Sequence, residues 1–158
     1  AWQILRKEFP EHKLVLVGRE DFFWKQLKTT SYILHPTSSI IFYGSATDEE
    51  LATLYKNAAL LVQPSLEEGF SLSPLEAISF GCPAAVSDIP IHHEILKDAA
   101  LFFNPLDPYS IAETIKTILN DSSSKIRLKT QSTALLSGYS WKSHAHTTRD
   151  LYESIYKV

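Results

Sequence analysis

The stretch EEGFSLSPLEA, at residues 67–77, holds the side chains whose types and spacing best suit binding chemistry. Glu68 and Glu76 are separated by seven residues, and Gly69 directly follows the first of them. A carboxylate accepts hydrogen bonds from two hydroxyl groups at once, which is how ribose diols are commonly held. Glycine lets the backbone approach a ligand closely, and the free N–H groups and dipole of a helix start favour a phosphate or another anion. The stretch therefore predicts a site that binds hydroxyl groups and an anion.

Two of the acids also have simpler explanations. Ser73, Pro74 and Glu76 match a capping box, in which Ser73 caps a helix and Glu76 reaches back to the cap. Glu67 fits a solvated loop acid. No GxxxxGK(S/T) loop and no GxGxxG motif occurs in the sequence, so ordinary P-loop or dinucleotide chemistry is not supported. The residues alone leave both interpretations of Glu76 open.

Short apolar runs are the elements that must position this stretch. Five occur: KLVLVG (13–18), IIFYG (40–44), ALLVQPS (59–65), PAAVSD (83–88) and ALFFNP (100–105). Such runs are typical of parallel strands covered by helices, and segments of helical length alternate with them. The sequence predicts an α/β fold, a Rossmann-like parallel sheet with helices on both faces. Ligands bind beyond the carboxyl ends of the strands in such sheets, where the turn after 59–65 lies.

Local signals mark the helices. Thr47 and Glu50 form a capping-box pattern, and Asp107 with Pro108 begins a helix over 107–121. The helix over 47–58 has one apolar stripe, made of Leu51, Leu54, Tyr55 and Ala58. Further helices are expected at 73–81, 91–98, 124–137 and 141–157, the last anchored by Tyr139 and Trp141. Within 19–39 a helix is indicated by Phe22, Phe23, Trp24 and Leu27, before HPTSS interrupts the pattern.

Composition limits the possible functions. The net charge of −3 disfavours a nucleic-acid partner. The single Cys82 excludes an internal disulfide framework and fits a small buried hydrophobe. The histidine pairs do not share helix faces, so no metal site is predicted from them: His92 with His93, and His144 with His146. No apolar run approaches the roughly 18 residues of a membrane span, and no signal-peptide pattern is present.

The first residues indicate how the chain is organised. The stretch AWQILRKEFPEHKLVLVG has the pattern of the last two turns of an amphipathic helix that leads into the first strand. Residues of the same fold are therefore expected before Ala1. The 158 residues favour one domain, 1–158, with C-terminal helices at about 124–157.

The stretch from Glu68 onward resembles the E-x7-E region of the GT-B retaining glycosyltransferases of family 4. Residues 68–87 are similar to the family pattern EGFGLxxLEAxxxGxPV, and 40–65 resembles its FxGx(V/L)xDxELxxLY region. Residues 92–121 and the last helix, with Trp141, are similar to the family as well. The resemblance covers nearly the whole chain from Leu14, and it implies the C-terminal half of a GT-B fold.

The resemblance implies a role for each matching residue. Glu76 holds the ribose hydroxyls of a sugar-nucleotide, and Glu68, the catalytic candidate, lies beside the donor sugar. The diphosphate or the sugar is received by the backbone of Gly69, Phe70, Ser71 and Leu72. The base is lined by Gly44, Ser45 and Ala46, and Gly18 borders the same cleft. Without the resemblance, Gly18 and Gly44 fit plain strand-ending turns.

Some positions depart from the family pattern. Ser71 replaces the commoner glycine and adds a hydroxyl, expected to be tolerated as an extra donor, and Ala99 and Ala100 stand where the family often has glycine. The Arg and Lys that bind the departing diphosphate in the family belong to a segment before Ala1. Arg19 lies near the expected mouth but fits a solvated charge. No metal and no other cofactor is expected, so cations and the helix dipole must stabilise the leaving group.

Three functions remain open at this point. The resemblance implies the donor-binding domain of a hexosyltransferase, with a nucleoside diphosphate sugar as donor and a sugar, lipid-linked sugar or polysaccharide as acceptor. The acceptor site is expected on an N-terminal domain, so these 158 residues alone are expected to be inactive. The expected location is the cytoplasm or the inner face of a membrane. The alternatives are a non-catalytic nucleotide-binding or scaffold module and a nucleotide-sugar epimerase of GT-B fold.

Overall fold

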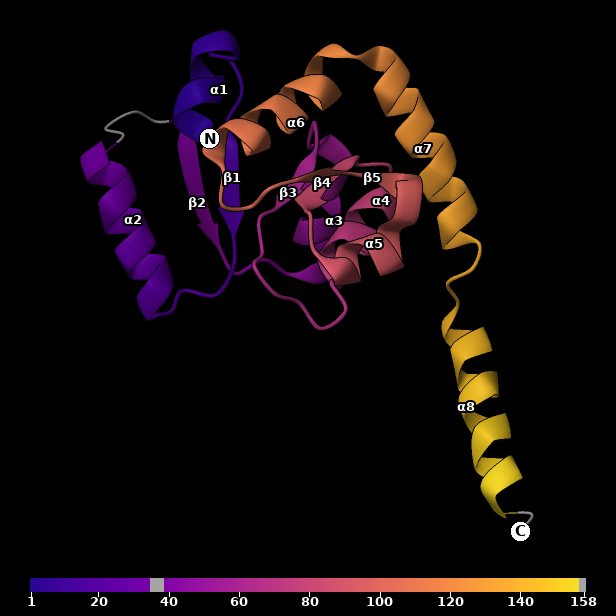
Figure 1. The fold of residues 1–158 in the computed structure, drawn as a ribbon. Coiled ribbons are helices and arrows are strands. Elements are labelled where there is room, and N and C mark those ends of the chain that lie inside the picture. Colours follow the sequence, from indigo (N-terminus) through magenta and orange to yellow (C-terminus); the bar gives the residue numbers. More distant parts are fainter. Residues whose placement is uncertain (35–38, 157–158) are drawn as a thin grey trace.

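The computed structural model describes residues 1–34 and 39–156. These residues form an α/β domain whose helices and strands alternate along most of the chain (Figure 1). The strands are β1 (Leu14–Val17), β2 (Ile40–Gly44), β3 (Leu61–Gln63), β4 (Ala84–Ser87) and β5 (Ala100–Phe103). The helices are α1 (Trp2–Glu8), α2 (Phe22–Leu34), α3 (Asp48–Asn57), α4 (Leu72–Ser79), α5 (Pro90–Leu96), α6 (Pro108–Asn120), α7 (Ser122–Leu136) and α8 (Trp141–Tyr156), with a 3₁₀ turn η1 (Lys97–Ala99).

All five predicted strands form, and all their pairings are parallel. β1 pairs with β2, and β4 lies between β3 and β5. No pairing joins β1 to β3 within the described residues, so the strands fall into two hydrogen-bonded groups rather than one continuous ladder. A short apolar run specifies a strand but not its neighbour, because the hydrogen bonds of a strand come from backbone groups that every residue carries. The α/β class is confirmed.

The core is built around β4, whose four residues are all buried. Ala84 and Val86 pack on one side against α4 and α5. Ala85 faces the other side, where it packs with Phe103 of β5 and with residues of α6 and α7. Alternate residues of a strand point to opposite faces, so the continuous apolar run is explained by helices on both.

The helix starts test the capping predictions. Thr47 forms the predicted capping box, since its hydroxyl accepts from the N–H of Glu50, whose carboxylate accepts from the N–H of Thr47. Asp107 caps α6 with Pro108 in the first turn, as predicted. The Ser73 capping box is wrong: α4 already begins at Leu72, and its N-cap is Ser71, in a left-handed conformation without a side-chain cap bond.

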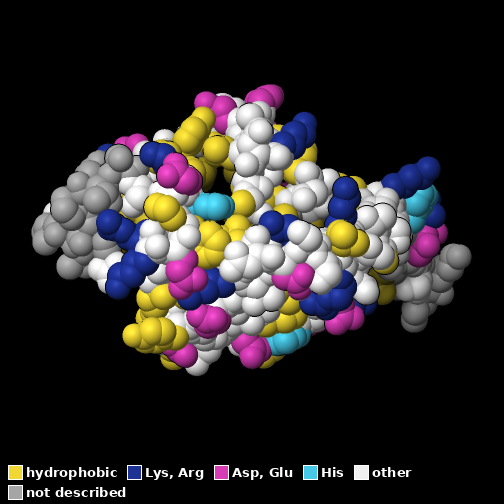
Figure 2. All heavy atoms as spheres, turned by 90° about the horizontal axis from the view of Figure 1, so that it is seen from above, with side chains coloured by type: hydrophobic (Ala, Val, Ile, Leu, Met, Phe, Trp, Pro, Cys, Tyr) yellow, Lys and Arg dark blue, Asp and Glu magenta, His cyan; other side chains and the backbone are white. Residues whose placement is uncertain are grey.

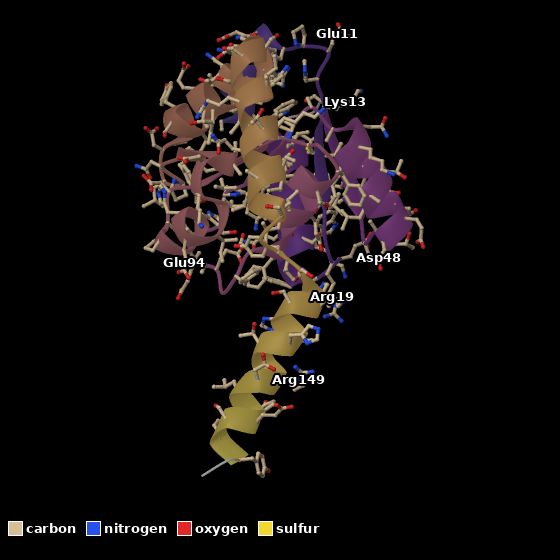
Figure 3. All side chains as sticks on the ribbon, turned by 90° about the vertical axis from the view of Figure 1, so that its right-hand side faces the viewer. Glu11, Lys13, Arg19, Asp48, Glu94 and Arg149 are labelled. Carbon is tan, nitrogen blue, oxygen red and sulfur yellow. The ribbon has the colours of Figure 1, made fainter. Side chains whose placement is uncertain are left out.

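Cys82 and the C-terminal helices complete the fold. Cys82 is buried beside Tyr55 and Ala77, as predicted, and burial raises the pKa of its thiol to about 11. Tyr139 is an anchor, because its hydroxyl donates to the carbonyl of Ile95. Trp141 is not an anchor: it is 83% exposed, since α8 extends away from the body (Figures 1 and 3). Of the predicted break HPTSS (35–39), residues 35–38 lie outside the described residues.

The charges on the surface are mixed in sign. Figure 2 shows the face seen from above in Figure 1, where acidic and basic side chains are interspersed. This face carries no field of a single sign that would steer a polyanion. Within the described residues, no helix is long and apolar enough to cross a membrane.

Candidate functional site

The site lies where the parallel strands end. The loop of residues 64–71 leads from the end of β3 to the start of α4. Arg19, Asp48 and Glu94 follow β1, β2 and β4, and Figure 3 shows them at the end of the α/β body from which α8 projects, opposite Glu11 and Lys13. This end is therefore the carboxyl edge of the strands, at which ligands bind in open α/β sheets.

Glu68 is held in a defined orientation at the end of this loop. Its Oε1 accepts from the side-chain amide of Gln63, at 2.8 Å, and from the hydroxyl of Ser65, at 2.7 Å. The Gln63 amide also donates to the Ser65 hydroxyl, at 3.0 Å. Both bonds to the carboxylate end on Oε1, so Oε2 is the oxygen that can accept from a ligand.

Glu76 lies in the second turn of α4 because the helix begins earlier than predicted. Its side chain is exposed, and its Oε2 accepts from the hydroxyl of Tyr55 on α3, at 3.4 Å. Burial, with the charge of Glu76 as the next cause, raises the pKa of Tyr55 to about 12. Tyr55 thus keeps its proton near neutral pH and remains a donor to the carboxylate.

Ser71 connects the loop to α5. Its φ of 70° and ψ of 66° are left-handed, and the residue is 7% exposed. Its hydroxyl lies 2.9 Å from Nε2 of His92, whose Nδ1 lies 2.8 Å from the carbonyl of Ser87. The structure thus places the Ser71 hydroxyl on a buried imidazole, not at the surface where an extra donor to a ligand was expected.

The glycines of the site differ in whether their backbone conformation or their surroundings require glycine. Gly44 has a φ of 84°, and a Cβ there would lie 2.8 Å from the Glu20 carboxylate, so the strand-ending turn itself requires glycine. A Cβ at Gly18 would make ordinary contact with Trp24. Gly69 is exposed, and a Cβ there would meet nothing within 4 Å. The surroundings of Gly69 are therefore open on the protein side.

The remaining predicted residues surround these groups. Phe70 is 42% exposed, and its ring meets that of Tyr139 edge-on at 6.3 Å. Leu72 is the first residue of α4 and is 54% exposed. Ser45 and Ala46 follow β2, with Ser45 exposed and Ala46 half-buried. Arg19 is exposed, as expected of a solvated charge.

Four residues of the site were missed in the sequence: Tyr55, Gln63, Ser65 and His92. In the sequence Tyr55 fits an apolar helix stripe, and His92 with His93 does not fit a metal site. A buried tyrosine hydroxyl usually has a hydrogen-bond partner, so a tyrosine in an apolar stripe indicates a polar contact that Tyr55 could make. The contacts of Tyr55 and His92 with the site join residues 21 apart in the chain, which no local pattern reveals.

A separate hollow of about 500 Å³ lies between η1 and the end of α7. Its lining includes Lys97, Gln131 and Tyr139, and none of the predicted site residues. The carboxylates and the helix start, not this hollow, define the candidate site. In the parts of the chain that the structure describes, no three His, Cys, Asp or Glu side chains gather in a way that could hold a metal ion.

Comparison with solved structures shows which fold this is. The chain superposes on sucrose-phosphate synthase from Thermosynechococcus elongatus with a TM-score of 0.82, at 24% identity, covering 92% of this chain and 39% of that one. It superposes on Anabaena HepE, solved in complex with UDP and glucose, with a TM-score of 0.81 at 16% identity, covering 96% and 44% of the two chains. The fold is that of a GT-B glycosyltransferase domain.

Sequence relatives agree with the fold. The O-antigen chain mannosyltransferase RfbU of Salmonella typhimurium is 37% identical over 105 residues, which are 66% of this chain and 30% of the relative. The O-antigen chain mannosyltransferase B of Escherichia coli is 33% identical over 158 residues, covering 97% of this chain and 40% of the relative. The chain thus spans between 30% and 40% of the length of these relatives. The family model described as "Glycosyl transferases group 1" matches residues 1–134, and the chain therefore belongs to that family.

Proposed function

We propose that this chain is the donor-binding domain of a retaining glycosyltransferase, which transfers a sugar from a nucleoside diphosphate sugar to an acceptor hydroxyl. The observation that carries the proposal is the placement of two carboxylates, Glu68 before and Glu76 after the amino end of α4. Glu68 accepts hydrogen bonds from Gln63 at the end of β3 and from Ser65 in its own loop, and Glu76 accepts a longer bond from Tyr55 on α3. The exposed Gly69 between them leaves room for a ligand.

Each group has a defined task in this proposal. Glu76 accepts hydrogen bonds from the ribose hydroxyls, and Glu68 accepts from hydroxyls of the donor sugar through Oε2. The amino end of α4, with the backbone from Gly69 to Leu72, binds the diphosphate. The bond between the sugar carbon and the diphosphate oxygen breaks, and the acceptor oxygen bonds to that carbon on the same face. The proton of the acceptor hydroxyl passes to the departing diphosphate. The nucleoside diphosphate leaves with a negative charge that the helix end stabilises, without a metal ion.

The comparisons favour mannose as the transferred sugar. Both relatives described above are named mannosyltransferases of O-antigen chains. Those relatives are longer than this chain, and we assign the acceptor site, for a sugar, a lipid-linked sugar or a polysaccharide, to another domain. Such a protein would act in the cytoplasm or at the inner face of a membrane.

Calorimetry with UDP, GDP and ADP tests the donor site. The native chain should bind at least one of them, and Glu76→Ala should weaken that binding about tenfold or more, because hydrogen bonds to a charged group are lost. The 2′-deoxy form of the same nucleotide should bind the native chain more weakly than the ribose form, and the two forms should bind Glu76→Ala alike. Glu67→Ala, which removes a neighbouring exposed acid, is the matched control.

Two results would contradict the proposal. If the native chain binds none of the three nucleotides, a scaffold function is favoured. If Glu76→Ala and Glu67→Ala weaken binding equally, or if Glu76→Ala still distinguishes ribose from deoxyribose, Glu76 does not hold the ribose.

A further inference from the structure

A chain of partly and fully buried hydrogen bonds joins the two ends of the loop of residues 64–71. At one end the side-chain amide of Gln63 holds Glu68, at 2.8 Å. The backbone carbonyl of Gln63 accepts from the hydroxyl of Ser87, at 3.2 Å. The carbonyl of Ser87 lies 2.8 Å from Nδ1 of His92, and Nε2 of His92 lies 2.9 Å from the hydroxyl of Ser71, at the other end of the loop.

The direction of these bonds follows from the chemistry of the groups. A carbonyl oxygen only accepts, so Nδ1 of His92 carries the proton in its contact with Ser87. In the neutral imidazole Nε2 is then an acceptor, and the Ser71 hydroxyl donates to it. Ser87 and His92 are fully buried, which keeps water from competing for either bond.

Ser71 adopts a backbone conformation that serine rarely takes. Its φ of 70° lies in the left-handed region, which favours glycine because a Cβ is unfavourable there. The residue is the N-cap of α4 but makes no side-chain bond to the helix, since its hydroxyl turns to His92 instead. The hydrogen bond to His92 thus offsets the unfavourable free energy of the left-handed conformation of Ser71.

We propose that His92 is a positioning residue that acts through Ser71. His92 holds Ser71 in its left-handed conformation. This conformation orients the free N–H groups at the start of α4 toward the diphosphate of the donor. This inference rests on the proposed function for its ligand. His93, the next residue, is exposed and pairs with Asp88, so it does not contact the loop through this hydrogen bond.

Substitutions at position 71 test the proposal with the least disturbance. Ser71→Gly adopts the turn without help, so it should bind a nucleoside diphosphate about tenfold more tightly than Ser71→Ala does. Ser71→Ala removes the hydroxyl and keeps the Cβ, so its Kd should rise about tenfold, because the competent conformation is less populated. Equal affinity of the two variants would overturn the proposal.

A double variant at His92 and Ser71 tests whether His92 acts through Ser71. His92→Leu should raise the Kd about tenfold, and the double variant His92→Leu with Ser71→Gly should restore it to within about twofold. If His92 only filled the core, the Ser71→Gly substitution would not restore the affinity lost in His92→Leu. His93→Leu is the matched control and should bind as the native chain does. A double variant that binds no better than His92→Leu would contradict the proposal.

Nuclear magnetic resonance separates this inference from the proposed function. The ¹⁵N shifts of His92 should show a proton on Nδ1 and none on Nε2, and the opposite tautomer would overturn the inference. The backbone order parameters of Gly69, Phe70 and Ser71 should be lower in Ser71→Ala and His92→Leu than in the native chain, and should return toward the native values in the double variant. Unchanged order parameters would refute the positioning role, whereas a native chain that binds no nucleotide would refute only the proposed function.

Discussion

The two carboxylates of the site are held to different degrees. Glu68 accepts two short bonds, at 2.8 and 2.7 Å, on one oxygen, so its orientation is set before a ligand arrives. Glu76 accepts a single long bond of 3.4 Å from Tyr55, and its side chain is exposed. A preorganised acceptor suits a reacting sugar whose position must be fixed, and an adaptable one suits a diol that only needs to be retained.

This difference predicts that Glu68→Gln changes sugar recognition more than nucleotide binding. The amide oxygen can replace Oε1 as the acceptor from Gln63 and Ser65, so the loop keeps its shape, while the ligand-facing atom becomes a donor. Calorimetry should give a nucleoside diphosphate affinity within about twofold of the native value and a nucleotide-sugar affinity lower by about tenfold. Equal losses for both ligands would place Glu68 at the nucleotide rather than at the sugar.

At the same scale, the sequence revealed the acids but not the residues that orient them. The spacing of Glu68, Gly69 and Glu76 is a local pattern, and it predicts the loop and helix that carry the candidate site. Tyr55 reaches Glu76 from α3, and His92 reaches Ser71 from α5. Such contacts depend on how helices pack, and the periodicity of a helix predicts which face is buried but not what lies opposite.

Two capping-box patterns of the same spacing have different outcomes in the elements. Thr47 with Glu50 forms the box at α3, and both of its bonds are present. Ser73 with Glu76 does not, because the left-handed turn at Ser71 starts α4 at Leu72 and places Ser73 inside the helix. The strands were predictable from their apolar runs, whereas the start of α4 depends on a tertiary hydrogen bond to His92.

The junction of α6 and α7 predicts a pH dependence. Asp121 caps α7. The hydrogen bond from the Ser123 hydroxyl to its carboxylate, and next in size the one from the Ser124 hydroxyl, lower the pKa of Asp121 from 3.8 to about 2. A carboxyl whose folded pKa is lowered stabilises the fold above its unfolded pKa, and this stabilisation disappears as the pH falls from about 4 toward 2.

Asp121→Asn should therefore lower the melting temperature near neutral pH, and the difference from the native chain should shrink below about pH 4. Thermal melts followed by circular dichroism across this range measure it. Asp98→Asn, at an exposed carboxylate in η1, is the control. A difference that stays constant with pH would show that the cap acts through geometry alone.

On the scale of the whole molecule, α7 packs against the core on both faces of β4, whereas α8 extends away from the body. Leu128 of α7 is fully buried in the cluster with Ala85, Phe103 and Ile118. Leu135 and Leu136, further along the same helix, pack on the cluster around Ala84 and Val86 on the other face of β4. No residue of α8 is buried, and Figures 1 and 3 show it projecting from the body.

Two truncations test this division. Removal of residues 141–158 should change the melting temperature of the body by no more than about 3 °C, because no residue described in α8 is buried. Removal of 122–158 also takes away Leu128, which is fully buried and contributes about 2–5 kcal/mol, and the partly buried Leu135 and Leu136. The remaining chain should therefore not fold cooperatively. Circular dichroism melts of both truncations against the full 158 residues measure the effect. A large drop on removing α8 alone would mean that this helix packs against the body in solution, and the exposed Trp141, Leu151 and Ile155 would then be its contact residues.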